Sequence, residues 1–272
     1  MVYYIQNILT LRVNMNSKIN WLVNHTTPGS LVLQQWLVEN GISHSLTQKY
    51  AQNGWLKKLF TGVYYRPDPI KNHIPNWADA LQALADQIHL QIHISGLTSL
   101  THQGLSHYLP LKSEKVWIGV RNKQSLPKWF KEFPNQNWQY CNNSKLRELS
   151  DKDFTIVLVN GKELKASTPE LAAYEAVDSI GKHISFEHTA ELFQGLVNLS
   201  PRKVQSLLNR SKAVQTNRIF LYLSHYHDHQ WVKRLDESQI ELGSGKRQVV
   251  TQGRYDERYK ITIPESLIPK SQ

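Results

Sequence analysis

The chain has 272 residues and a formal net charge of +10 at pH 7, with 40% hydrophobic and 20% charged residues. Its eight tryptophans, twelve tyrosines and seven phenylalanines give it more buriable surface than a disordered chain carries. The single cysteine, Cys141, excludes a disulfide scaffold and a four-thiolate zinc site. No apolar run approaches the roughly 18 residues of a membrane span, and the first residues do not read as a secretory signal. We therefore expect a cytoplasmic protein without a membrane partner.

The positive charge is concentrated near the N-terminus. Residues 1–75 contain seven lysines and arginines against two acids, a net charge of +5, whereas residues 76–165 carry +3 and residues 166–272 carry +2. A basic domain on a nearly balanced body is typical of a module that binds a polyanion. A solvated basic surface without a partner would have the same composition.

The first predicted elements are two helices. Hydrophobic spacing favours helices over Ser17–His25 and Leu31–Asn40, and Gly41 ends the second. Between them, Thr27-Pro28-Gly29-Ser30 offers a capping threonine and a proline suited to a first helical turn. Residues 1–14 precede this pattern, and the sequence does not say whether they belong to the native protein.

A third helix and a hairpin follow. Ser43–Asn53 reads as a helix with Ser43 as its N-cap and Gly54 just beyond its end. Trp55–Phe60 and Val63–Arg66 read as two short strands around Thr61-Gly62. Two helices joined by a tight turn and followed by a hairpin predict a winged helix-turn-helix.

The remainder predicts a larger mixed domain. Three prolines in Pro67–Pro75 mark a linker, so we place the winged domain at residues 15–70 and the second domain at 74–272, an α+β architecture overall. The hydrophobic pattern of this domain predicts six helices: Trp77–Asp86, Thr98–His107, Pro169–Ile180, Phe186–Leu196, Pro201–Asn209 and Arg218–His225. It predicts five strands: His89–Ile94, Lys115–Val120, Phe154–Val159, Gln248–Thr251 and Tyr259–Ile263. In the first of these strands, His89 and His93 are expected on a polar face.

The third helix carries the strongest functional signal. Its outward side chains include no acid, and short polar groups there can read base edges in the major groove while nearby cations neutralise phosphates. We expect DNA contacts from these residues: Ser43, His44, Ser45, Thr47, Gln48, Lys49 and Gln52 of the helix, and Lys57, Lys58 and Arg66 of the hairpin. A three-helix protein-interaction module is the alternative.

A second basic run lies near the C-terminus. The segment Leu196–Arg218 contains five cations and no acid. Together with the cations of Leu242–Arg247, this run forms a candidate second basic surface, which would contact phosphate or act in the second domain's own function: Arg202, Lys203, Arg210, Lys212, Arg218, Lys246 and Arg247. A solvated pair of helices is the more common outcome for such a run.

Other motifs do not support an enzyme. Leu242–Arg247 lacks the glycine spacing of a phosphate-binding loop. His225 and His229 have the i, i+4 spacing of helical zinc ligands, but Tyr226 stands where a hydrolytic helix carries its glutamate. The strand that would carry the paired carboxylates of a nucleotidyltransferase has none. We therefore predict no cofactor, no metal and no catalytic residue.

Several short motifs, taken together, resemble the AbiEi family, the antitoxins of type IV abortive-infection toxin–antitoxin systems. They run in order from about residue 15 to residue 264: Pro28-Gly29-Ser30, Trp36-Leu37, Gly41-Ile42-Ser43, Gly54-Trp55-Leu56, Gly62-Val63-Tyr64, Trp77, Gly96-Leu97-Thr98-Ser99-Leu100, Arg218-Ile219-Phe220-Leu221, Trp231, Leu235-Asp236, Leu242–Arg247, Tyr255-Asp256 and Tyr259–Pro264. This chain departs from the family pattern at Leu171, where relatives have an arginine, and at Asn217, where a lysine is usual.

The resemblance implies a phage-defence function. Such proteins repress their own operon through the winged helix, bind inverted repeats in double-stranded DNA, and counteract a nucleotidyltransferase-like toxin without a stable complex. Two molecules would then bind DNA together, although no dimer helix is evident. The alternatives are a ligand-responsive repressor without a toxin partner, and a metal-dependent enzyme that uses the His225–His229 cluster.

Overall fold

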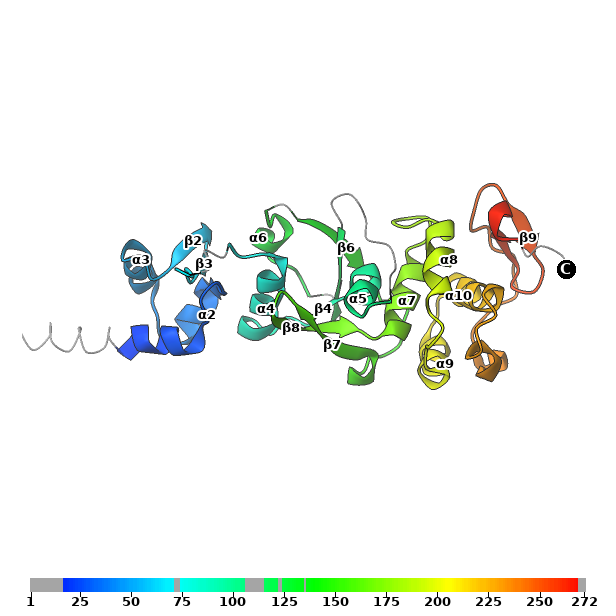
Figure 1. Cartoon of the computed structure of the whole chain (residues 1–272), viewed down its shortest axis with the longest axis horizontal. Coiled ribbons are helices and arrows are strands. Elements are labelled where there is room, and N and C mark those ends of the chain that lie inside the picture. Colours follow the sequence, from blue (N-terminus) through cyan, green and yellow to red (C-terminus); the bar gives the residue numbers. More distant parts are fainter. Residues whose placement is uncertain (1–16, 71–73, 106–114, 122–123, 135, 269–272) are drawn as a thin grey trace, which may run out of the picture. The chain divides into compact units, whose positions relative to one another are not determined.

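A computed structural model describes residues 17–70, 74–105, 115–121, 124–134 and 136–268 (Figure 1). The chain forms two compact units. The first lies within Met1–Gln91 and Ser125–Pro134, and the second within Ile92–Gln124 and Asn135–Gln272. The first unit thus consists of two separate stretches of sequence, and each unit is described by itself below.

The first unit is built around a three-stranded antiparallel sheet. A helix over residues 17–25 precedes β1 (Leu31–Leu33), α2 (Gln34–Glu39) and α3 (His44–Gln52), and the hairpin β2 (Lys57–Phe60) and β3 (Val63–Tyr65) follows. The strands are ordered β1-β3-β2, so β2 lies at an edge. The helices and sheet enclose one apolar core: Leu22, Val32, Leu37, Ile42, Tyr50, Leu56 and Tyr64. This is the predicted winged helix-turn-helix.

The prediction that a helix begins at Leu31 is wrong. Leu31–Leu33 form β1, which pairs antiparallel with β3 in the register Leu31↔Tyr65 to Leu33↔Val63. All three leucine and valine side chains are buried. In a helix, one of these three side chains would face solvent. Their burial and their pairing with β3 therefore favour a strand here, although the residues that follow are helical.

Helix α4 (Trp77–Gln87) belongs to the first unit by its contacts, although its sequence position placed it in the predicted second domain. A capping box between Asn76 and Asp79 starts it. At its other end the Gln87 amide donates to the Leu31 carbonyl at 2.7 Å and accepts from the Leu33 N–H at 2.8 Å. Gln87 therefore satisfies the backbone edge of β1 that β3 leaves free. The domain boundary at residues 70–74 stays a prediction.

The short helix α6 (Lys128–Lys131) is the second, separate piece of the first unit. Phe130 and Phe133 are buried, and the ring of Phe133 lies 6.2 Å from that of Phe60 on β2. No helix was predicted here, because a four-residue segment shows no helical periodicity.

The second unit contains a five-stranded mixed sheet in the order β6-β5-β4-β8-β7. Its strands are β4 (Ile92–Ile94), β5 (Lys115–Val120), β6 (Asn137–Cys141), β7 (Phe154–Val159) and β8 (Lys162–Ser167). The predicted strands at Lys115–Val120 and Phe154–Val159 are confirmed. The strand predicted over His89–Ile94 is shorter, because His89 has a φ of 54° and breaks the extended backbone.

The polar face predicted for His89–Ile94 is wrong at His93, whereas His89 is exposed as expected. His93 is 2% exposed, its Nε2 lies 3.5 Å from Glu175 Oε1, and the Phe154 ring packs edge-on against it. Glu175 in turn accepts from the Gly96 N–H and the Ser167 hydroxyl at 2.8 and 2.9 Å. This buried polar cluster links the sheet to the helices that cover it.

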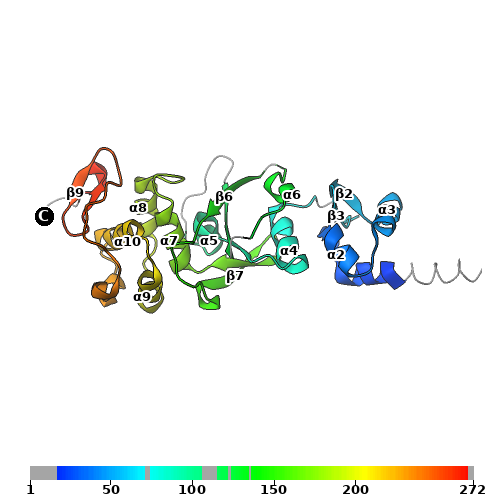
Figure 2. The ribbon, with the colours of Figure 1, turned by 180° about the vertical axis from the view of Figure 1, so that it is seen from behind.

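Helices pack on the sheet and on one another. Helix α7 (Pro169–Asp178) lies between the sheet and the group formed by α8 (Phe186–Gln194), α9 (Pro201–Arg210) and α10 (Val214–Tyr226), and α5 (Gly96–His102) packs beside it (Figures 1 and 2). Nearly every residue of α7 is buried, as its central place requires. These helices form the main core of the unit.

The chain continues through an irregular segment into the hairpin β9 (Arg254–Asp256) and β10 (Ile261–Ile263). The strand predicted at Gln248–Thr251 is not formed, since only Arg247 makes a bridge there, to Ile261. The hydroxyl of Thr262 accepts from the Val249 and Val250 N–H groups and donates to the Val250 carbonyl. Hydrogen bonds to the Thr262 side chain thus take the place of the backbone strand pairing that the apolar pattern predicted.

Candidate nucleic-acid interface

Helix α3 is held in place by predicted local features. The Ser43 hydroxyl accepts from the Leu46 N–H at 3.3 Å, which makes Ser43 the N-cap. Gly41 and Gly54, on either side, have φ values of 77° and 76°, a left-handed conformation that favours glycine. Ile42 and Tyr50 are buried in the core, so the opposite face of α3 is directed to solvent.

That solvent face is polar and free of acidic groups. His44, Gln48 and Gln52 are exposed and follow one another at i, i+4 spacing, so they share one line along the helix. Ser45 and Lys49 form the neighbouring line and are also exposed. Amide and hydroxyl groups can donate to and accept from base edges, and the ammonium group of Lys49 suits a phosphate.

The prediction that Thr47 faces outward is wrong. Thr47 is fully buried, and its hydroxyl donates to the Ser43 carbonyl at 3.0 Å and accepts from the Gln34 amide at 3.1 Å. Thr47 therefore joins α3 to α2 and cannot reach a base edge in this conformation. Gln34, at the start of α2, is the partner that hydrophobic spacing could not reveal.

The hairpin presents two lysines on its edge strand. Lys57 and Lys58 are both exposed on β2 and pair with Tyr65 and Tyr64, respectively. Successive strand residues point to opposite faces, so Lys58 shares the face of the buried Tyr64 and Lys57 lies on the other. Both side chains are exposed, and they lie on opposite sides of the strand.

Arg66 does not fit its predicted role at a phosphate. Its guanidinium donates to the carbonyls of Val23 and Thr26 at 2.9 and 2.5 Å. These carbonyls lie at the end of the helix over residues 17–25, where backbone acceptors lack partners. Arg66 therefore ties that helix end to the hairpin.

Trp55 is a candidate contact that the sequence did not predict. Its side chain is 48% exposed and lies three residues beyond the end of α3 and two residues before Lys57. An exposed tryptophan beside cations offers a flat ring to a sugar or base. The sequence signal for this contact was a tryptophan close to a pair of lysines.

The candidate second basic surface divides into two kinds of residue. Arg210 forms a bidentate ion pair with Asp153, with nitrogen–oxygen distances of 2.6 and 3.0 Å. These hydrogen bonds outweigh the effect of burial and hold the pKa of the Asp153 carboxyl below its usual range. The charge of Arg210 is thus already compensated within the unit.

The prediction that Arg218 contributes to a surface is wrong. Arg218 is 2% exposed, and its guanidinium donates to the carbonyls of Leu242, Gly245 and Lys260 at 2.5, 2.6 and 3.3 Å. It therefore holds the loop over residues 242–247 and the turn before β10 in place. The cations that remain exposed are Arg202, Lys203, Lys212, Lys246 and Arg247.

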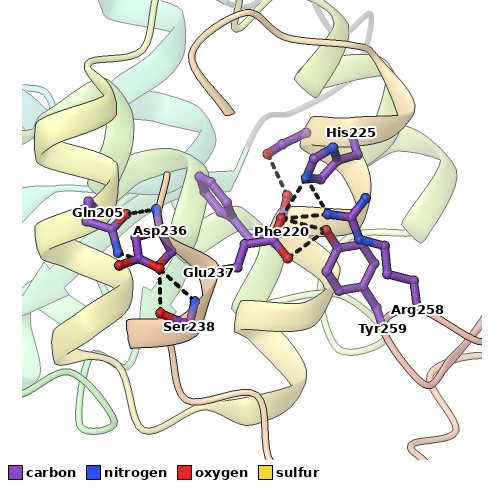
Figure 3. A network of polar contacts seen from close by, with 9 residues as sticks. Gln205, Phe220, His225, Asp236, Glu237, Ser238, Arg258 and Tyr259 are labelled. Atoms are coloured by element: carbon purple, nitrogen blue, oxygen red, sulfur yellow. Dashed lines mark hydrogen bonds and ion pairs between the residues drawn. The ribbon is translucent and has the colours of Figure 1, made fainter. Parts of the chain in front are cut away.

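The side chains of the histidine cluster make hydrogen bonds within the protein. His225 Nε2 lies 2.8 Å from Glu237, which also accepts from Arg258 at 2.9 Å and from the Tyr259 hydroxyl at 3.2 Å (Figure 3). His227 and His229 donate to the carbonyls of Ala190 and Phe193, each at 2.7 Å. No group of three or more potential ligands for a metal ion occurs in the described part of the chain. These side chains join α10, α8 and the C-terminal segments.

A winged helix-turn-helix with an exposed acid-free helix, followed by a larger α/β unit, is the architecture of a two-domain transcriptional regulator. The chain belongs to the AbiEi antitoxins: residues 15–111 match the family described as "Transcriptional regulator, AbiEi antitoxin N-terminal domain", and residues 113–264 match "Transcriptional regulator, AbiEi antitoxin, Type IV TA system".

One solved structure supports the fold. The crystal structure of the RV2827C protein from Mycobacterium tuberculosis is similar over 91% of this chain and 90% of that one, with a TM-score of 0.59 and 15% sequence identity. No protein with a curated description matches the sequence. Within the described residues, no helix has the length and apolar character needed to cross a membrane.

Proposed function

We propose that this chain is a non-catalytic cytoplasmic protein that represses its own operon and counteracts a nucleotidyltransferase-like toxin encoded beside it. Membership in the AbiEi antitoxins supports both functions at the level of the family. The observation that carries the DNA-binding part is the exposed, acid-free face of α3 next to the exposed lysines of β2.

In this proposal α3 lies in the major groove. His44, Gln48 and Gln52 follow one line of the helix and are placed to contact successive base edges, and Ser45 and Lys49 flank them. The hairpin β2–β3 contacts the backbone through Lys57 and Lys58. Because those lysines point to opposite faces of β2, each would contact a different phosphate. Binding to an inverted repeat would place two copies on the DNA.

The test of DNA reading is fluorescence anisotropy of the full chain with DNA from upstream of its own reading frame. We expect Gln48→Ala to lower the preference for this DNA over a scrambled duplex by about tenfold, because one good base contact contributes about 1–3 kcal/mol of discrimination. Gln35→Ala is the matched control, since Gln35 is an exposed glutamine on α2 that bonds to Glu39. If Gln48→Ala and Gln35→Ala show the same preference for this DNA over the scrambled duplex, α3 does not read the bases as proposed.

Toxin antagonism is tested by co-expression with the neighbouring reading frame. The full chain is expected to restore growth, and Lys57→Ala with Lys58→Ala is expected to restore it equally while losing repression. That result would separate the two functions without truncating the chain. The antitoxin part of the proposal is rejected if no nucleotidyltransferase gene lies beside the gene for this protein, or if the unmodified protein does not restore growth. Either result would favour a repressor without a toxin partner.

A further inference from the structure

The second unit contains a cavity of about 200 Å³ that none of the roles above uses. Asp153, Thr168 and Glu170 line one side, and α9 lines the other through Arg202, Lys203 and Arg210. An open hollow of about 620 Å³ continues along α9 and shares Arg202, Ser206 and Arg210 with the cavity. The two spaces together are large enough for a small ligand.

One carboxylate oxygen in this cavity accepts no hydrogen bond within the described residues. Glu170 is 5% exposed, and its Oε1 accepts from the Ser200 N–H at 2.9 Å. Its Oε2 is buried and has no hydrogen-bond partner in the described part of the chain, and the Lys203 ammonium stands 4.0 Å away. A buried acceptor of this kind costs free energy unless a donor reaches it, so it marks a position for an N–H or O–H group.

The mouth of the cavity is positively charged. Arg210 is compensated by Asp153, but Lys152 and Arg202 are exposed and make no ion pair within the described residues. Lys203 is the third cation, and it forms a long ion pair with Glu170 Oε2 at 4.0 Å. The starts of α7 at Pro169 and of α9 at Pro201 flank the cavity, and helix N-termini attract negative charge. The site therefore favours an anion that also carries a hydrogen-bond donor.

We propose that this cavity binds a free nucleoside monophosphate. The phosphate group lies among Lys152, Arg202 and Lys203, where its two negative charges are matched. A sugar hydroxyl or base amino group donates to Glu170 Oε2, and the remainder of the nucleoside extends into the adjoining hollow. Inorganic phosphate alone would leave Glu170 without its donor. This inference concerns the second unit and does not depend on DNA reading by α3.

The test is calorimetric titration of the full chain with AMP, GMP, CMP and UMP, and separately with inorganic phosphate. We expect at least one nucleotide to bind about tenfold more tightly than phosphate, the difference that one hydrogen bond to a charged group provides. Arg202→Ala is expected to weaken nucleotide and phosphate alike, by about tenfold.

Glu170→Gln separates the two parts of the site. The glutamine oxygen can still accept from the Ser200 N–H, so the fold is retained, which the unfolding midpoint verifies. We expect this variant to bind the nucleotide about tenfold more weakly while phosphate binding stays equal or improves, because a negative charge has been removed. Lys212→Ala, an exposed cation beyond the end of α9 and outside the cavity, is the matched control and should change neither affinity.

Several results would overturn the proposal. These are phosphate binding as tightly as every nucleotide, no nucleotide binding at all, equal losses in Lys212→Ala and Arg202→Ala, or unchanged nucleotide binding in Glu170→Gln. Binding of a 5′-phosphorylated RNA that no mononucleotide displaces would also reject it, since the occupant would then be a polymer.

Discussion

Two segments of this chain are rich in cations and free of acids over a long run, yet the folded protein uses them differently. In the first unit, Lys49, Lys57 and Lys58 are all exposed and available to a partner. In the second unit, Arg202, Lys203 and Lys212 are exposed as well, but Arg218 is buried against three carbonyls and Arg210 is paired with Asp153. A run of positive charge in a sequence therefore does not say whether the charge is available.

The difference follows from the chemistry of the two side chains. Guanidinium groups have five donors in a planar fork, so they can satisfy several carbonyls at once and are the better cation for an interior. Ammonium groups are strongly hydrated and stay at the surface on flexible stems. Arg66 obeys the same rule within the winged domain, because it holds a helix end instead of facing outward.

The largest effect should come from Arg218→Ala. Removing this side chain leaves the carbonyls of Leu242, Gly245 and Lys260 without their donor and opens a space in the core. We expect a loss of about 3–5 kcal/mol in the free energy of unfolding, measured by urea denaturation. Arg218→Lys should recover only part of it, because an ammonium cannot span the three acceptors. A loss below about 1 kcal/mol would show that the loop holds itself in place.

The exposed lysines should affect binding and not stability. Replacing Lys57 and Lys58 by alanine is expected to lower the slope of log affinity against log salt by about two units, since each phosphate contact contributes about 0.9. The slope is measured by anisotropy at several salt concentrations. Lys233→Ala with Arg234→Ala removes the same charge from exposed positions in the second unit. The distinction between the two regions fails if both pairs change the slope equally.

Thr47→Val tests which face of α3 is turned inward. The substitution keeps the shape but removes the hydroxyl that bonds to Ser43 and Gln34, so we expect the free energy of unfolding to fall by about 1–2 kcal/mol. Affinity for DNA should stay unchanged under conditions where the variant is fully folded. A loss of sequence preference at full stability would place Thr47 at the DNA after all.

A smaller, pH-dependent effect is expected from the second unit. Burial lowers the pKa values of His227 and His229 below 6.5, so the native state keeps them neutral while the unfolded chain takes up protons. The free energy of unfolding should therefore fall as pH decreases from 7 through 6.5, down to the lowered native values. The effect of Asp153 falls in a different window, because its lowered pKa stabilises the fold above about pH 4 and that contribution is lost below it.

Denaturation at pH 7.5, 6.5 and 5.5 measures the histidine effect. The variant with glutamine at positions 227 and 229 should show a weaker dependence over this range, because glutamine can donate to the same carbonyls without titrating. If the pH dependence of the free energy of unfolding is unchanged in this variant, other titrating groups cause it.

Much of the fold could be predicted because its signals are local. Ser43 and Gly54 mark the ends of α3 through capping and turn chemistry, and the apolar run Phe154–Val159 marks β7. Strand β8 was missed because Lys162–Ser167 reads as polar. The signal for it was Asn160-Gly161, whose φ values of 50° and 78° form the two-residue turn of a hairpin.

The candidate site was less predictable than the fold. Helical spacing correctly predicted that His44, Gln48 and Gln52 face outward. It placed Thr47 with them, because it could not show that Gln34 draws Thr47 inward. The partners of Arg210 and Arg218 lie dozens of residues away along the chain, at Asp153 and at Lys260. Such contacts depend on tertiary packing, which local patterns do not encode.

The two-part composition of the first unit has a consequence for biosynthesis. The chain passes from one unit to the other after Gln91, returns at Ser125 and leaves again after Pro134. On a ribosome, which releases the chain from its N-terminus, α3 and the hairpin emerge long before α6, whose neighbour Phe133 packs against Phe60. The first unit is therefore completed only after the first strands of the second unit have been synthesised, so the order of translation links the maturation of the first unit to that of the second.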